Sequence, residues 1–162
     1  MSYLTEPAAY FSSRILVGHG SKLTPMFAHQ HNITHVINCA DESASPEWFK
    51  QTRPKAYACL NAIDSFEHNI LDWYPAFEST LLRFLREGEG AVYVHCQAGI
   101  NRSAFLALTY VVTHYGFPLE RTIVTTRGQR RCMFQNPVFM NQVREFINNG
   151  RVQSQESSRT VQ

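Results

Sequence analysis

The chain has 162 residues, of which 44% are hydrophobic and 17% are charged, with a formal net charge of +2. This length and composition are those of one globular domain that can bury a core without disulfides or metal ions. The small net charge and scattered lysine and arginine residues are not typical of a dedicated nucleic-acid-binding protein. Because the sequence contains neither a secretory signal nor a long apolar run, we expect an intracellular protein, cytoplasmic or nuclear or both, without membrane association.

Hydrophobic periodicity predicts an alternation of strands and helices. In chain order the sequence predicts strands at 14–18, 35–40 and 57–62, a helix from Pro75 to Gly88, a strand at 91–96, and helices at 103–115, 118–131 and 136–149. The run at 91–96 is apolar almost throughout, which indicates a central strand covered on both faces. The alternation predicts an α/β fold. We expect a single domain over residues 1–149, followed by a polar, disordered tail at 150–162.

The segment HCQAGINRSA (95–104) combines a nucleophile with an anion site. A strand that leads through a glycine-containing loop into a helix directs several backbone N–H groups at one point, where they favour negative charge. Cys96 lies in that position, and together with Arg102 this setting favours the thiolate form of the cysteine. The planar guanidinium of Arg102 can hold two phosphate oxygens at once, and Gly99 lets the backbone approach the anion closely.

Three further residues complete this chemistry. Ser103 can donate a hydrogen bond to the thiolate when it leaves a phosphocysteine, and we expect His95 to order the loop by hydrogen bonding rather than to act as a base. The departing alkoxide or phenoxide also needs a general acid, for which Asp64 is the first candidate because it lies on a loop after the predicted strand 57–62. The residue types leave other acids open, namely Asp41, Glu42, Glu67 and Asp72.

The stretch HCQAGINRS resembles the HCxxGxxRS/T signature of cysteine-dependent protein phosphatases of the protein tyrosine phosphatase superfamily, and specifically the small dual-specificity branch. The segments RILVGHG, HVINCADE, AIDSFEHNIL and NPVFMNQVREF are similar to further segments of that family. The resemblance implies a central mixed, mostly parallel sheet of about five strands flanked by helices. It implies catalysis by Cys96, Arg102, Asp64 and Ser103, with no cofactor or metal. The implied phosphate-binding residues are Gln97, Ala98, Gly99, Ile100, Asn101 and Arg102.

The same resemblance implies a phosphorylated protein as the substrate, dephosphorylated at tyrosine and at serine or threonine. Two departures from the family pattern bear on this. Arg127 precedes Gly128 where relatives have an Arg-Pro pair, and Asn101 stands where many relatives have serine. Asparagine at that position also occurs in phosphatases that remove the γ-phosphate of RNA 5′-ends. An RNA 5′-triphosphatase and a non-catalytic phosphate-binding module are therefore the alternative functions, and the oligomeric state is not predicted.

Three other groups of residues have two interpretations each. Cys39 could lie near Cys96 as a resolving thiol and redox partner, although core packing is the simpler role. The basic run RGQRR (127–131) is interpreted as a solvated helix face, with an anion-attracting rim as the alternative. The histidines at 29, 31 and 35 lack nearby carboxylate and cysteine partners at ligand spacing, so we expect no metal site.

Overall fold

The computed structural model describes residues 5–160, with side chains described through residue 151. Five strands form one sheet in the order β1-β2-β5-β3-β4, in which β1 is antiparallel to β2 and all other neighbours are parallel. The strands are β1 (Ala9–Ser12), β2 (Ile15–His19), β3 (Ile33–Asn38), β4 (Tyr57–Cys59) and β5 (Ala91–Cys96). The helices are α1 (Pro25–Gln30), α2 (Glu47–Thr52), α3 (Tyr74–Glu87), α4 (Arg102–Tyr115), α5 (Leu119–Gln129) and α6 (Pro137–Thr160). The predicted α/β fold with a mixed, mostly parallel sheet is confirmed.

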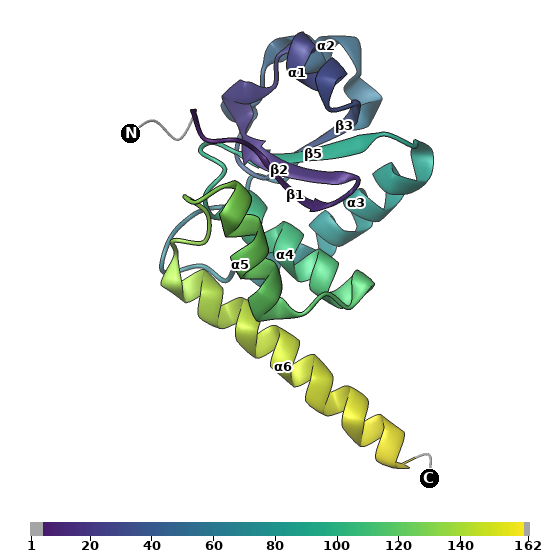
Figure 1. Cartoon of the computed structure of the whole chain (residues 1–162), viewed down its shortest axis with the longest axis vertical. Coiled ribbons are helices and arrows are strands. Elements are labelled where there is room, and N and C mark those ends of the chain that lie inside the picture. Colours follow the sequence, from purple (N-terminus) through teal and green to yellow (C-terminus); the bar gives the residue numbers. More distant parts are fainter. Residues whose placement is uncertain (1–4, 161–162) are drawn as a thin grey trace.

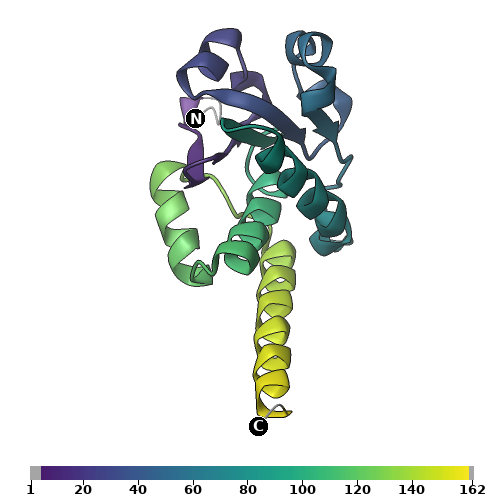
Figure 2. The same cartoon turned by 90° about the vertical axis from the view of Figure 1, so that its right-hand side faces the viewer.

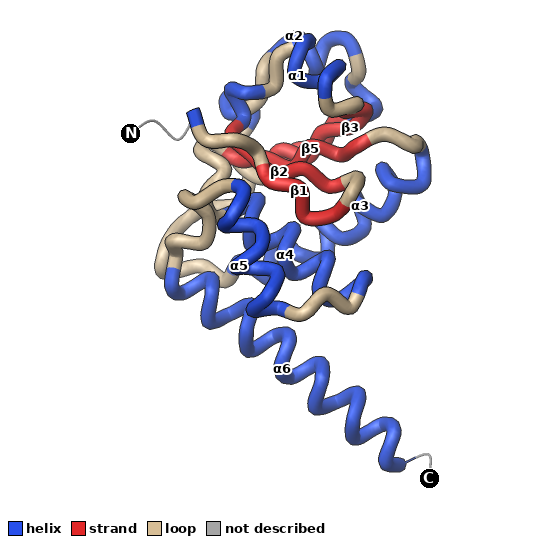
Figure 3. The backbone as a smooth tube through the Cα atoms, in the orientation of Figure 1, coloured by secondary structure: helices blue, strands red, loops and turns tan. Residues whose placement is uncertain are grey.

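The helices cover the two faces of the sheet unequally. Helices α1 and α2 lie on one face and α3 to α6 on the other (Figure 1), while the tube drawing separates the strands from these two layers (Figure 3). Side chains of β5 alternate between the layers, since Val92 and Val94 belong to the larger core cluster whereas Tyr93 belongs to the smaller one. The strand is buried at every residue, as its apolar sequence predicts.

The central position of β5 determines where the candidate site lies. Its parallel neighbours β2 and β3 end beside it, so that His19 pairs with Cys96 and Asn38 pairs with His95. In sheets of this kind, ligands bind beyond the carboxyl ends of the strands. Helix α4 begins six residues after Cys96 and is buried at ten consecutive positions, from Ser103 to Val112. The loop between β5 and α4 is therefore held between two rigid, buried elements.

Three short elements were not predicted from the sequence. Strand β1 has four residues and lies at the edge of the sheet, and α1 and α2 have six residues each. Elements this short contain too little periodicity to stand out from loops. Strand β4 is also shorter than predicted: it ends at Cys59, two residues before Asn61, whose left-handed conformation (φ 55°) interrupts the extended backbone.

Helix α6 does not end at Asn149 as predicted. It continues to Thr160, and its last turns extend away from the rest of the molecule (Figures 1 and 2). A glycine inside a helix costs only about 1 kcal/mol relative to alanine, so Gly150 weakens the helix without terminating it. The structure describes residues 150–160 as helix, and residues 161–162 lie outside the described part of the chain. The division into a catalytic unit at 1–149 and a disordered tail at 150–162 stays a prediction.

Candidate active site

The nucleophile candidate lies at the end of the central strand. Cys96 is the last residue of β5 and only 3% of its surface is exposed. Its Sγ is 3.2 Å from the hydroxyl oxygen of Ser103, which is itself completely buried in the first turn of α4. The strand and the helix thus bring into contact the thiol and hydroxyl that the sequence predicted to work together.

The loop between Cys96 and α4 directs its carbonyl groups toward Arg130 and Phe134, on one side of the loop. The carbonyls of Ala98 and Gly99 accept hydrogen bonds from Arg130, and the carbonyl of Ile100 accepts one from the N–H of Phe134 at 2.8 Å. In a trans peptide the N–H points opposite to the preceding carbonyl. The N–H groups of residues 99, 100 and 101 therefore point to the other side of the loop, as an anion-binding cradle requires.

Gly99 is essential to this loop for two reasons. Its φ of +69° lies in the left-handed region, which side chains disfavour. A Cβ atom at this position would also lie 2.4 Å from the carbonyl carbon and oxygen of Gly18. The loop packs directly onto the end of β2, so no larger residue fits without moving the backbone.

Arg102 is the first residue of α4 and occupies the predicted position beside the thiol. One of its terminal nitrogens donates a hydrogen bond to the carbonyl of Ala62 at 3.0 Å. Its Nε is buried and has no hydrogen-bond partner among the described residues. A buried, unsatisfied donor of a charged group is unfavourable, so the guanidinium is arranged to receive an anion that brings the missing acceptor.

His95 orders the loop from inside the protein. The ring is completely buried, with Nε2 3.0 Å from the hydroxyl of Ser45 and Nδ1 3.1 Å from the carbonyl of Cys96. Because a carbonyl only accepts hydrogen bonds, Nδ1 must be protonated, and Nε2 then accepts from Ser45. Burial lowers the pKa of His95 to about 4, so the ring is neutral near pH 7. This environment matches the predicted supporting role.

Asp64 lies on the loop of residues 60–69 that follows β4 (the acid loop), next to the loop of residues 97–101 between β5 and α4 (the phosphate loop). The side-chain amide of Asn101 donates to Oδ2 of Asp64 at 2.9 Å, and the amide of Asn136 donates to Oδ1 at 3.0 Å. Residues 61–64 share a hollow of about 320 Å³ with Asp41 and Arg102. The fold therefore brings Asp64 to the same place as Arg102, although 38 residues separate them in the chain.

The competing carboxylates have other partners or lie outside the hollow. Glu42 accepts hydrogen bonds from Tyr57 and Lys50. Asp41 lines the same hollow as Arg102, but hydrogen bonds from the side chain and backbone of Ser43 lower the pKa of its carboxyl, which keeps it ionised. Glu67 and Asp72 are exposed and do not line this hollow. Of the five acids, Asp64 alone contacts the phosphate loop through a hydrogen bond reported among the described residues.

Arg130 is a supporting residue that the sequence interpretation missed. The residue is completely buried and donates hydrogen bonds to the carbonyls of Ala98 and Gly99, and to those of Glu6 and Pro7. The interpretation of RGQRR as a solvated face is therefore wrong at this position. A signal was present, since residue 130 continues the buried stripe of α5 formed by residues 119, 122, 123 and 126.

Arg127 holds the turn between α5 and α6, and it is followed by Gly128 where relatives have proline. Its guanidinium donates to the carbonyls of Met133 and Phe134, at 3.2 and 2.8 Å, while Gly128 stays inside α5. Two of the three arginines in the cluster thus bind backbone carbonyls, and Arg131 remains exposed.

The structure also shows the surroundings of the cysteines and histidines for which a redox or metal role was considered. All four cysteines are free thiols. Cys39 follows β3 and its N–H donates to the carbonyl of His95 at 2.7 Å; burial raises the pKa of its thiol well above the usual value. His31 contacts the hydroxyl of Tyr10, and His35 contacts Thr34 and Glu87, so these rings have separate partners. Among the described side chains, those of residues 5–151, no group is suited to hold a metal ion.

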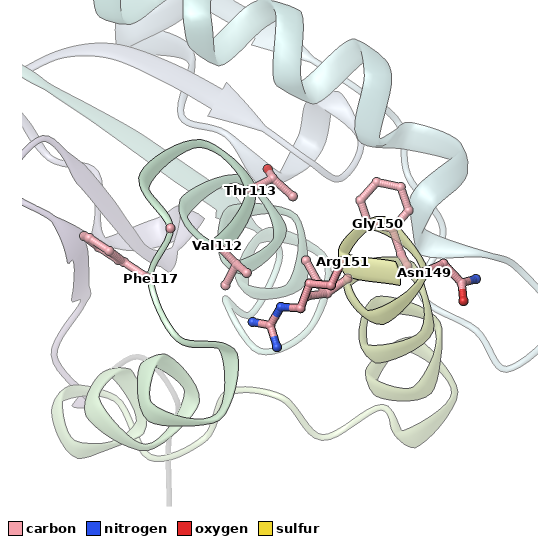
Figure 4. Close-up of a pocket in the computed structure, with 9 residues that line it drawn as sticks. Val112, Thr113, Phe117, Asn149, Gly150 and Arg151 are labelled. Carbon is pink, nitrogen blue, oxygen red and sulfur yellow. The ribbon is translucent and has the colours of Figure 1, made fainter. Parts of the chain in front are cut away.

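Cavity size does not identify the site. A hollow of about 610 Å³ lies where the end of α4 meets α6, and Figure 4 shows Val112, Phe117 and Arg151 at its walls. This region is at the opposite end of α4 from Arg102, and its lining contains neither a cysteine nor a carboxylate. The smaller hollows beside Asp64 are lined by Asn101 and Arg102 among others, although Cys96 is not among their lining residues. Across the described part of the chain, helices are too short or too polar to span a membrane.

Comparison with known proteins identifies the family. The family model for the catalytic domain of dual specificity phosphatases matches residues 15–149. Dual specificity protein phosphatase 22 of Xenopus laevis is 33% identical over 118 residues, which cover 73% of this chain and 54% of that protein. This chain therefore spans about half the length of that curated relative.

Solved structures share the fold. The crystal structure of human tyrosine phosphatase-like serine/threonine/tyrosine-interacting protein matches with a TM-score of 0.72 at 24% identity, covering 86% of this chain and 94% of the other. Human DUSP28 matches with a TM-score of 0.77 at 18% identity, covering 93% and 99%. The resemblance noted in the sequence is confirmed: this chain belongs to the dual specificity phosphatase family.

Proposed function

We propose that the protein is a protein phosphatase that hydrolyses phosphotyrosine and phosphoserine or phosphothreonine through a phosphocysteine on Cys96. The observation that carries the proposal is the convergence of a buried thiol, a loop with its N–H groups on one side, and Arg102 with an unsatisfied donor. The family assignment supports the same activity. Gln97 to Arg102 are proposed to bind the phosphate.

In the first step the Cys96 thiolate attacks phosphorus, and the bond between phosphorus and the leaving oxygen breaks. The loop N–H groups and Arg102 stabilise the charge on the three equatorial oxygens. Asp64 gives its proton to the leaving oxygen, so that the dephosphorylated residue departs as a neutral hydroxyl.

In the second step the Asp64 carboxylate takes a proton from a water molecule, which attacks phosphorus. The sulfur–phosphorus bond breaks, and inorganic phosphate and the Cys96 thiolate are released. The Ser103 hydroxyl, 3.2 Å from the sulfur, donates a hydrogen bond to the departing thiolate. None of these steps needs a metal or cofactor, and we expect activity to persist in a chelator.

The surroundings of Asp64 support a broad substrate range. Ile63 and Phe66, which lie on the acid loop on either side of Asp64 in the chain, are 47% and 69% exposed, so apolar side chains form the rim. The hollow next to Arg102 is lined by residues of the acid loop and by Asp41, without aromatic side chains that would build a deep wall. Such a site is suited to short phosphoserine and phosphothreonine side chains as well as to phosphotyrosine.

Hydrolysis of a small aryl phosphate by the wild type and by Cys96→Ser tests the activity. We expect turnover that is lost in the variant, with a bell-shaped pH profile because Cys96 must be ionised while Asp64 is protonated. Binding of phosphate without turnover would instead identify a non-catalytic phosphate-binding module. Matched phosphotyrosine and phosphothreonine peptides then test dual specificity, and cleavage of the tyrosine peptide alone would contradict it.

RNA 5′-triphosphate is the alternative substrate. Asn101 kept this alternative open, but in the structure its side chain contacts Asp64 and the N–H groups of residues 135 and 136. The basic cluster gives it little support, because Arg127 and Arg130 are engaged by backbone carbonyls. Release of phosphate from triphosphorylated RNA at a rate above that for phosphopeptides would favour the alternative.

A further inference from the structure

Asn101 joins the phosphate loop to the acid loop. Its side-chain oxygen accepts hydrogen bonds from the N–H groups of Gln135 and Asn136, both at 2.9 Å. Its side-chain nitrogen donates to Asp64 at 2.9 Å. With both ends of the amide engaged, the side chain cannot turn without losing at least two hydrogen bonds, so it presents a fixed donor to the carboxylate.

Asn136 holds the same carboxylate from a second direction. Its amide donates to Oδ1 of Asp64 and to the carbonyl of Ser65, both at 3.0 Å, while its oxygen caps the first turn of α6. Each oxygen of Asp64 thus receives one N–H from an asparagine that is fixed at its other end. Two such bonds restrict both the position and the rotation of the carboxyl group.

We propose that Asn101 is a positioning residue for the general acid, which ties Asp64 to the phosphate loop so that its free face points at the bound phosphate. The inference rests on the proposed function and adds a role for the residue that precedes Arg102. The Asn101 side chain acts through Asp64, whereas its backbone N–H belongs to the loop that is proposed to bind the phosphate.

The two hollows beside Asp64 show which face is free. One hollow, of about 300 Å³, is lined by Asp64 together with both asparagines that donate to it. The other is lined by Asp64 and Arg102. A carboxylate oxygen has two lone-pair directions, and the amides occupy one on each oxygen. The remaining directions are left for the proton, and Asp64 shares the second hollow with Arg102.

The dependence of kcat/KM on the leaving group distinguishes a residue that positions the general acid from one that only supports the loop. A general acid matters when the leaving oxygen is strongly basic and contributes little when it is a good leaving group. For Asn101→Ser, we expect kcat/KM for unactivated phenyl phosphate to fall about tenfold, the equivalent of one hydrogen bond to a charged group. For an activated nitrophenyl phosphate we expect a change of less than about twofold. Serine is chosen because many members of this family carry it here.

A second variant keeps the turn at Gln135 intact. Asn101→Asp retains an oxygen for the N–H groups of residues 135 and 136, but it replaces the donor to Asp64 by a second carboxylate. We expect the alkaline limb of its kcat/KM profile to move to higher pH, because repulsion favours the protonated form of Asp64. The other charged and titratable groups around Asp64 are unchanged: these are Arg102 and Asp41 in the shared hollow, and Glu67 and His68 on its own loop.

Asn69→Ser is the matched control. Asn69 lies on the same loop and its oxygen caps Leu71, which serine can also do, and Asn69 does not line either hollow beside Asp64. We expect wild-type kinetics with both substrates. Asp64→Asn is the reference for complete loss of the acid and should show the steepest dependence on the leaving group.

The results distinguish failure of the positioning role from failure of the proposed function. Equal losses of Asn101→Ser on both substrates, or no loss on either, would overturn the positioning role while Asp64→Asn still behaves as an acid-deficient enzyme. If Asn101→Ser misfolds, Asn101→Asp tests the positioning role instead. An unmoved alkaline limb and an unchanged leaving-group dependence in that variant would overturn the role. An inactive wild type, or an Asp64→Asn enzyme without leaving-group dependence, would instead contradict the proposed function.

Discussion

Two arginines flank the loop between β5 and α4, and their hydrogen-bond donors are satisfied to different degrees. Arg102, on the side proposed to bind substrate, donates to the carbonyl of Ala62 and keeps a buried Nε without a partner among the described residues. Arg130 lies behind the loop, is completely buried, and donates to four backbone carbonyls. The hydrogen bonds behind the loop are therefore complete in the folded chain, whereas the guanidinium on the proposed substrate side keeps a donor for a ligand.

Arg102→Lys should show the largest effect on activity. Lysine cannot hold two phosphate oxygens in one plane, and arginines in this role contribute about 10³ to 10⁵-fold. We expect kcat/KM for an aryl phosphate to fall by at least about 10³, with a melting temperature within about 2 °C of the wild type because little packing is lost. A variant that lost stability instead of activity would contradict the assignment of Arg102 to the substrate side.

Arg130→Met should act on stability. The substitution leaves four carbonyls without their donor, and each buried acceptor that stays unsatisfied costs about 1 to 3 kcal/mol. Urea unfolding measures this loss, with Arg131→Met as the control because Arg131 is the exposed neighbour. We expect the control to remain within about 0.5 kcal/mol of the wild type. If Arg130→Met kept its stability but lost turnover, the two arginines would not divide the work as inferred.

His95 extends the comparison to pH, because it too lies behind the loop. Burial lowers its pKa to about 4 in the folded chain. In the unfolded chain the ring is therefore protonated below about pH 6.5, while in the folded chain it stays neutral down to about pH 4. Stability contributed by neutral His95 is complete above pH 6.5 and is lost as the pH falls toward 4. Between pH 7 and pH 4.5, we expect the wild type to lose about 2 to 3 kcal/mol more than His95→Asn in urea unfolding. Parallel pH dependences would show that the ring is not held neutral.

Cys39 gives the smallest expected effect. As a redox partner it would attack a sulfenic acid formed on Cys96 by peroxide, creating a disulfide and releasing water. Burial raises the pKa of the Cys39 thiol, so we expect the disulfide to form slowly and in higher yield as the pH rises. Mass spectrometry of peroxide-treated protein measures the linked peptides, with Cys39→Ala as the control. Absence of the disulfide at every pH would assign Cys39 to core packing.

Much of the site could be read from one continuous segment. The order strand, glycine loop, helix in residues 91–115 places Cys96, Gly99, Arg102 and Ser103 by local geometry, because each is only a few residues from the next. The central sheet and the family followed from the same segment and its neighbours. The edge strand β1, the short helices α1 and α2, and the continuation of α6 past Gly150 were not predicted, since their local signals are weak.

The sequence by itself therefore predicted the nucleophile, its arginine and the chemistry that they share, since those depend on residue types at short spacing. Its residue types alone left five carboxylates open as the acid, and the tertiary structure showed which of them contacts the phosphate loop and what holds that loop from behind. Asp64 is brought to Asn101 by the packing of β4 beside β3, and Arg130 reaches the loop carbonyls because α5 directs its buried stripe at them. Contacts across 30 or more residues leave no local pattern, since they depend on how buried elements pack.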